Sequence, residues 1–90
     1  MTAPLPLGKV VATPGALKLL GKSGGHPFDL LVRHATGDWG DLCAFDRHQN
    51  QIALRDGYRV LSSYEVPAGR VWIITEANRS VTTILLPEEY

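Results

Sequence analysis

The chain has 90 residues, of which 44% are hydrophobic and 20% charged, so it is long enough for one domain and too short for a second core. Nine basic and nine acidic residues give a formal net charge of zero, which argues against the basic excess typical of nucleic-acid-binding modules. The single cysteine, Cys43, excludes an intrachain disulfide and a zinc cluster built from cysteines.

The N-terminal residues carry no clear periodicity. Residues 1–8 hold two prolines and are expected to form a flexible arm. Residues 9–12, with the sequence KVVA, fit either a short strand or an extended lead-in, and the pattern leaves this open. The start also lacks the regions of a signal peptide, and no run approaches about 18 apolar residues, so we expect a cytoplasmic protein that does not enter the membrane.

Two short helices are expected in residues 13–36. Thr13 and His26 each precede a proline, which at the first helical position sacrifices no needed donor. The glycines of residues 21–25 end the first helix. The apolar stripe of the second, at spacings of three and four, consists of Phe28, Leu31, Val32 and Ala35. This phase turns Arg33 and His34 away from the core.

A third helix is expected between Asp41, which can cap its start, and Gly57, which suits a left-handed C-terminal position. Its apolar side is expected to hold Leu42, Phe45, Gln49, Ile52 and Ala53. Its solvent side is expected to hold Asp46, Arg47, Asn50 and Arg55.

Three runs rich in β-branched and aromatic residues follow, at 58–66, 70–76 and 81–86, separated by the turn sequences Pro-Ala-Gly and Ala-Asn-Arg-Ser. The middle run is apolar on both faces, with Ile73 on one and Trp72 and Ile74 on the other. It therefore suits a central strand or a face that is buried against a partner. The predicted fold class is α+β, with two to three N-terminal helices packed on a three-stranded antiparallel meander.

Polar side chains are concentrated between the second and third helices. The candidate binding residues here are Arg33, His34, Asp38, Trp39 and Asp41, in a loop where two glycines permit unusual backbone angles. A structural interpretation competes with binding, because the two aspartates can cap a helix, the tryptophan can cover the core and the arginine can pair with a carboxylate.

A second polar cluster lies in the turn between the last two strands. Glu76 and Arg79 are the candidate binding residues here. Arg79 and the neighbouring hydroxyls could hold an anion or a peptide carboxylate. The structural alternative is a surface ion pair of Glu76 with Arg79, which contributes little to stability.

A metal-dependent hydrolase is the first alternative to a binding protein. His34, Asp38, Asp41, Asp46 and His48 offer nitrogen and oxygen ligands within a short stretch. Their spacing matches no known metal motif, and no nucleophile elbow or phosphate-binding loop is present. No catalytic residue, metal or cofactor is therefore predicted. A nucleic-acid-binding adaptor is the second alternative, which the balanced charge disfavours.

The sequences GDWG at residues 37–40 and WIITEANRSVTTILLPEEY at residues 72–90 resemble a family of small uncharacterised bacterial proteins carried on plasmids, integrons and other mobile DNA. The resemblance runs from about Val10 to Tyr90. It implies a setting on mobile DNA and no established activity. In the family pattern an acid often stands where this chain has Asn78, so an acid-dependent site at that turn is not expected.

The leading hypothesis is a non-catalytic binding or accessory protein, encoded on mobile DNA, that self-associates, and a protein partner is a further possibility. Its expected binding surface combines the loop from Arg33 to Asp41 with the turn from Thr75 to Arg79. A homo-oligomer is expected because a 90-residue domain buries a small core.

Overall fold

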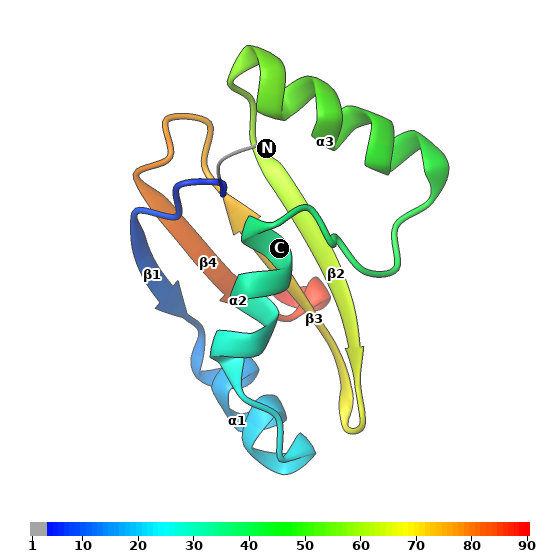
Figure 1. The fold of residues 1–90 in the computed structure, drawn as a ribbon. Coiled ribbons are helices and arrows are strands. Elements are labelled where there is room, and N and C mark those ends of the chain that lie inside the picture. The colour runs from blue at the N-terminus through cyan, green and yellow to red at the C-terminus, as the bar shows by residue number, and fades with distance from the viewer. Residues whose placement is uncertain (1–3) are drawn as a thin grey trace.

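The computed structural model describes residues 4–90 as helices packed on a mixed four-stranded sheet (Figure 1). In chain order the elements are β1 (Lys9–Ala12), α1 (Pro14–Ser23), α2 (Pro27–Ala35), α3 (Ala44–Asp56), β2 (Val60–Val66), β3 (Gly69–Thr75), β4 (Val81–Leu85) and the single-turn 3-10 helix η1 (Pro87–Glu89). The α+β class is confirmed. None of the helices within residues 4–90 combines the length and hydropathy needed to cross a bilayer.

The sheet has the strand order β1-β4-β3-β2. The predicted antiparallel meander is present as β2, β3 and β4. The prediction of a purely antiparallel, three-stranded sheet is wrong, because β1 adds a fourth strand parallel to β4, with Lys9 opposite Val81 and Ala12 opposite Ile84. The connection from β1 to β4 includes most of the chain, so no local turn sequence predicts this pairing.

The helices begin and end close to the predicted signals. The Thr13 side chain accepts a hydrogen bond from the Ala16 backbone N–H at 3.1 Å, and Gly24 ends α1 in the left-handed region. Gly57 ends α3 in the same way. The start of α3 differs from the prediction, because the backbone N–H of Asp41 bonds to strand β2 and the helix begins only at Ala44.

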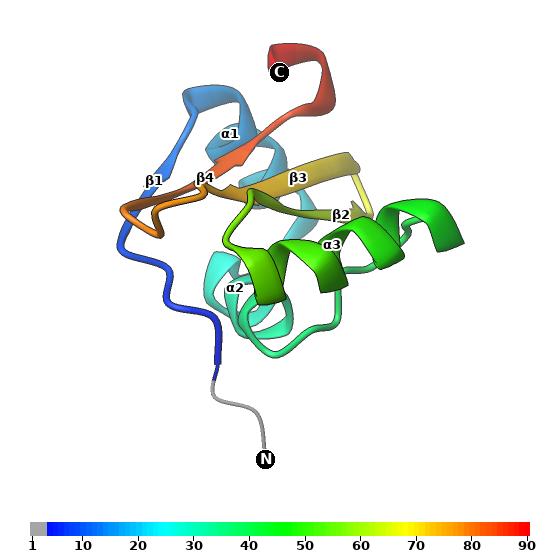
Figure 2. The ribbon, with the colours of Figure 1, turned by 90° about the horizontal axis from the view of Figure 1, so that it is seen from above.

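The core lies between the sheet and α1 and α2. Figure 2 shows α2 and α3 on one side of the sheet and the C-terminal turn on the other. The buried core cluster consists of Ala16, Leu20, Leu30, Tyr64, Val71, Ile73 and Ile84. The predicted phase of α2 is wrong, because Leu30 and His34 are buried while Phe28 is 66% exposed.

Helix α3 lies beside β2, one of the two edge strands of the sheet (Figure 1). Asn50, predicted to face solvent, is buried; its amide donates to the Leu61 carbonyl at 2.6 Å and accepts from the Leu61 N–H at 3.1 Å. Phe45, predicted on the apolar side, is 68% exposed. The helix is thus oriented by a hydrogen-bonded pair as well as by apolar contacts.

The opposite face of β3 carries Trp72. The Trp72 ring meets the Tyr90 ring edge-on at 5.6 Å, and Arg59 donates to the Tyr90 hydroxyl at 2.7 Å. The chain end after β4 therefore returns across this face, so the Trp72 face is partly covered from within the chain.

The N-terminal residues that the structure describes lie against the fold. Of the predicted arm, residues 1–3 lie outside the described part. Leu5 is 7% exposed, its N–H bonds to the Ala35 carbonyl at 2.9 Å, and it packs with Ala53 and Val60. This segment thereby fills the space between the end of α2 and the end of α3.

Candidate functional site

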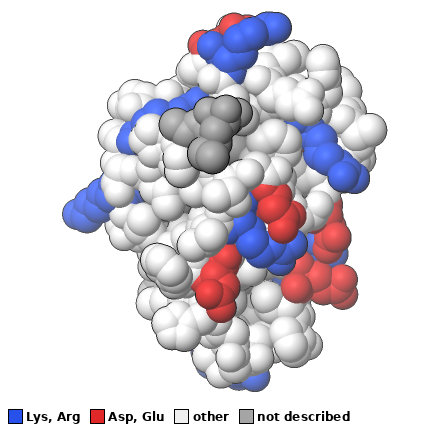
Figure 3. All heavy atoms as spheres, viewed as in Figure 1, with Lys and Arg blue, Asp and Glu red and all other residues white. Residues whose placement is uncertain are grey.

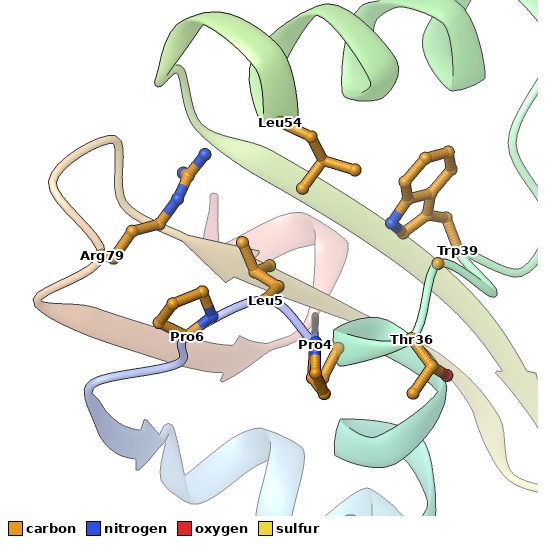
Figure 4. Close-up of a pocket in the computed structure, with 9 residues that line it drawn as sticks. Pro4, Leu5, Pro6, Thr36, Trp39, Leu54 and Arg79 are labelled. Atoms are coloured by element: carbon orange, nitrogen blue, oxygen red, sulfur yellow. The ribbon is translucent and has the colours of Figure 1, made fainter. Parts of the chain in front are cut away.

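A cavity of about 560 Å³ opens where four segments of the chain meet. These segments are the N-terminal residues 4–6, the end of α2 with the following loop, the end of α3, and the turn between β3 and β4 (Figure 4). The lining residues are Pro4, Leu5, Pro6, Ala35, Thr36, Gly37, Trp39, Leu54 and Arg79. The volume falls in the range of small-ligand pockets, and the walls are mostly apolar.

The backbone around Trp39 is fixed to the edge of β2. The Trp39 carbonyl accepts from the Ser63 N–H at 3.0 Å, and the Asp41 N–H donates to the Ser63 carbonyl at 2.7 Å. Gly40, between them, has φ of 72°, and a Cβ there would overlap the Ser63 carbonyl oxygen. These contacts fix the loop at the edge of β2, and Trp39 packs against the cluster of Leu5, Ala53 and Val60.

Arg79 forms the opposite wall (Figure 4). Its backbone has φ of 61°, a left-handed conformation suited to the tight turn. Its guanidinium donates to the carbonyl oxygens of Tyr58, of Glu76 at 3.2 Å and of Ala53 at 2.9 Å. A cation at the last turn of α3 is also favoured by the helix dipole. Arg79 thus joins the end of α3 to the β3–β4 turn.

Arg33 and Asp38 pair with each other and do not line the pocket. The Asp38 carboxylate accepts from Arg33 Nε at 2.7 Å and from Nη2 at 3.3 Å, and the guanidinium lies 4.6 Å from the centre of the Tyr64 ring. The hydrogen bond from Arg33 holds the pKa of Asp38 below its usual value. Both side chains are about half exposed, so this pair adds little stability.

Asp41 and Glu76 also have arginine partners. Asp41 lies 3.4 Å from Arg70, and Glu76 lies 3.5 Å from Arg59. The Glu76–Arg79 surface pair considered from the sequence does not form; Glu76 instead offers Arg79 only its backbone carbonyl. Neither Asp41 nor Glu76 lines the pocket.

His34 is part of a buried hydrogen-bond chain. It is 1% exposed, with Nδ1 2.6 Å from the Ser62 hydroxyl and Nε2 2.8 Å from the Thr75 hydroxyl. Thr75 lies 2.7 Å from the Thr82 hydroxyl, which donates to the Leu7 carbonyl. Both ring nitrogens are therefore engaged inside the core, away from solvent.

The donor and acceptor in each of these buried hydrogen bonds follow from counting the available protons. The proton of Thr82 goes to a carbonyl, which can only accept, so Thr75 must donate to Thr82. Nε2 of His34 must then carry a proton and donate to Thr75, which leaves Nδ1 to accept from Ser62. Burial lowers the pKa of His34 from 6.5 to about 4, so the ring is neutral at pH 7. Ser62 is fully buried and is no accessible nucleophile.

The structure brings together two of the seven predicted binding residues, Trp39 and Arg79. It places Arg33, Asp38, Asp41 and Glu76 in ion pairs outside the pocket, and His34 in the core. Within residues 4–90, no group of three or more His, Cys, Asp or Glu side chains is arranged to hold a metal ion. Sequence reasoning missed Leu5 and Leu54; the alternation of proline and leucine in residues 4–7 was the available signal.

No protein-family model matches the chain, and no curated protein or solved structure matches it significantly. The resemblance to the mobile-DNA family therefore stays a prediction.

Proposed function

We propose that this chain is a non-catalytic binding protein, encoded on mobile DNA, whose binding site is the pocket between Trp39 and Arg79. The observation that carries the proposal is that two polar segments far apart in sequence supply opposite walls of one cavity. The walls are held by hydrogen bonds to backbone groups of Ser63, Tyr58 and Ala53. A preformed apolar cavity with few polar groups is typical of ligand sites.

The geometry favours binding over a metal-dependent hydrolase. His34 has no free ring nitrogen, and the Asp38 carboxylate is engaged by Arg33. The three residues expected to act together, His34, Asp38 and Asp41, thus make separate interactions. Bound as they are, they offer neither a general base nor a set of metal ligands.

Charge argues against a nucleic-acid adaptor. On the face shown in Figure 3, basic and acidic side chains are interspersed and much of the surface is uncharged. Four arginines have an acidic partner within 4.0 Å: Arg33, Arg55, Arg59 and Arg70. Backbone binding to nucleic acid needs clustered cations that release counterions from phosphates, and the face in Figure 3 shows no such cluster.

A screen of small apolar fragments by two-dimensional NMR tests the pocket. We expect hits to shift the resonances of Thr36, Trp39 and Leu54 together, because these residues line one cavity. Trp39→Ala should weaken the hits at least about tenfold by removing one wall. Phe45→Ala is the matched control, since Phe45 is a 68% exposed aromatic residue outside the pocket. Hits scattered over the surface, or unaffected by Trp39→Ala, would contradict the proposal.

We further propose that two copies associate through β1, the open edge of the sheet. Lys9 and Thr13 donate their N–H groups to Ser80 and Ile84 on the β4 side, so the alternate residues Val10 and Ala12 direct their backbone groups outward. Within residues 4–90, β4 is the only strand that pairs with β1, and Val10 is 42% exposed. An open apolar edge is a template for pairing with another strand.

An edge-blocking substitution tests the association. Val10→Pro removes an outward N–H and leaves the hydrogen bonds to β4 in place, so light scattering should show a dimer for the wild type and a monomer for V10P. Val10→Thr keeps the N–H and the branched side chain and should remain dimeric. A monomeric wild type at high concentration, or a dimeric V10P, would refute association through this edge.

A further inference from the structure

The pocket walls offer hydrogen-bond donors and no carboxylate. The lining residues include no Asp or Glu, and the one charged lining residue is Arg79. The Thr36 hydroxyl is already used, since it donates to the Val32 carbonyl at 2.8 Å. The side-chain donors available to a ligand are therefore those of Arg79 and Trp39.

Arg79 retains free donor capacity. Its three hydrogen bonds to carbonyls come twice from Nη1 and once from Nη2. The guanidinium has five N–H groups, so Nε–H and one Nη2–H have no acceptor among residues 4–90. The Nε–H lies on the Nε–Nη2 edge of the planar guanidinium, and this edge can bind a carboxylate with two parallel hydrogen bonds when the Nη2–H beside Nη1 is the one that donates to Ala53.

The charge of Arg79 is also unpaired. No carboxylate within residues 4–90 lies within 4.0 Å of it, whereas Arg33 and Arg59 each have one. Arg79 lines the open pocket, and no side-chain nitrogen in the described residues is both buried and without a partner. An anionic ligand would therefore meet a cation that is held in place and not already neutralised.

Trp39 supplies a second donor. Figure 4 shows the indole nitrogen on the side of the ring that faces Leu5 and Leu54. No acceptor for this N–H is found among residues 4–90, and Trp39 lines the pocket. Between the two donors the wall is formed by Leu5, Leu54 and Ala35, which suit an apolar body.

We propose that the pocket binds a small apolar monocarboxylate, with the carboxylate on the Nε and Nη2 groups of Arg79 and the apolar body between Leu5 and Leu54. The assignment rests on the proposed function of the pocket as a binding site. A small acid is favoured over a chain end because the cavity volume of about 560 Å³ matches small-ligand sites.

Titration with 3-phenylpropionate, followed through the two indole N–H resonances, tests the assignment. Trp39 should shift saturably, while Trp72, on the other face of the sheet against Tyr90, serves as an internal control. The neutral isostere 3-phenylpropionamide should bind about tenfold more weakly, because it loses the charge-assisted hydrogen bonds. Trp39→Phe keeps the aromatic wall and removes an N–H that this ligand does not use, so the affinity for the acid should change by less than about twofold.

Arg79→Lys keeps the charge and loses the bidentate edge, so it should reduce the preference for acid over amide. Because Arg79 also supports the end of α3, Arg59→Lys is measured beside it as a control and should keep the preference for acid over amide.

Equal affinity for acid and amide would overturn the carboxylate assignment and leave the pocket proposal standing. A shift with a leucine-terminated tetrapeptide but not with the free acid would overturn the small-molecule assignment. Fragment hits at the pocket with no shift by any acid would overturn this inference alone.

Discussion

Lowering the pH from 6.5 to 4 should reduce the free energy of unfolding by about 3 kcal/mol through His34. Burial lowers the pKa of folded His34 to about 4, against 6.5 for the free side chain. Between these values the unfolded chain binds a proton that the folded chain does not, so stability falls as the pH falls. The stabilisation is fully present above pH 6.5 and lost by pH 4. Urea unfolding at a series of pH values measures it.

His34→Gln identifies the source of this slope. The amide can still bond to Ser62 and Thr75, and it carries no titrating group, so the loss of stability between pH 6.5 and 4 should largely disappear. His48→Gln is the matched control: His48 is exposed on α3, and its replacement should leave the slope unchanged. A slope that persists in H34Q would show that the buried histidine is not its origin.

The sequence predicted the parts of the fold that depend on local chemistry. Thr13 before proline marks the start of α1, and Gly57 marks the end of α3. The strands β2, β3 and β4 follow the β-branched runs and their turns. In each case the signal and the structure it forms lie within a few residues of one another.

The errors arise where distant segments decide the outcome. His34 is buried because Ser62 and Thr75 supply hydrogen-bond partners from strands β2 and β3. Asn50 is buried because it can pair with both backbone groups of Leu61. A prediction from the spacing of apolar residues places polar residues in solvent, because it contains no information on hydrogen-bond partners from distant segments. The pairing of β1 with β4 is missed for a related reason. The sequence of residues 9–12 fits both an unpaired extended segment and a strand, and its partner lies far away in the chain.

The candidate site shows the same division. The two polar clusters were recognisable from composition, and Trp39 and Arg79 were among the predicted binding residues. That they share a pocket follows from the register of β2 with the loop at Gly40 and from the position of Leu5. Asp38, Asp41 and Glu76 instead pair with arginines, and the partners of Asp41 and Glu76, Arg70 and Arg59, lie outside the two polar clusters.

Asn50→Ala should lower the free energy of unfolding by about 2 kcal/mol, because it removes two hydrogen bonds that join α3 to the edge of β2. Hydrogen exchange gives a local readout: the Leu61 amide should lose protection, and that of Val71 in the core should follow only the global change. Gln49→Ala is the control, since Gln49 is exposed on the same helix and its replacement should change stability by less than about 0.5 kcal/mol. A stability of N50A equal to the wild type would contradict this role.

The same substitution should change how copies associate. In the wild type the outer edge of β2 is covered at Leu61 by Asn50 and at Ser63 by the Trp39–Asp41 backbone, whereas the β1 edge is open. One open edge per copy limits pairing to a closed dimer, but two open edges permit open-ended stacking of sheets. Light scattering of N50A should therefore show species larger than the dimer, and V10P in the same chain should reduce them by closing the β1 edge. Unchanged mass in N50A would mean that the Ser63 contacts alone protect β2.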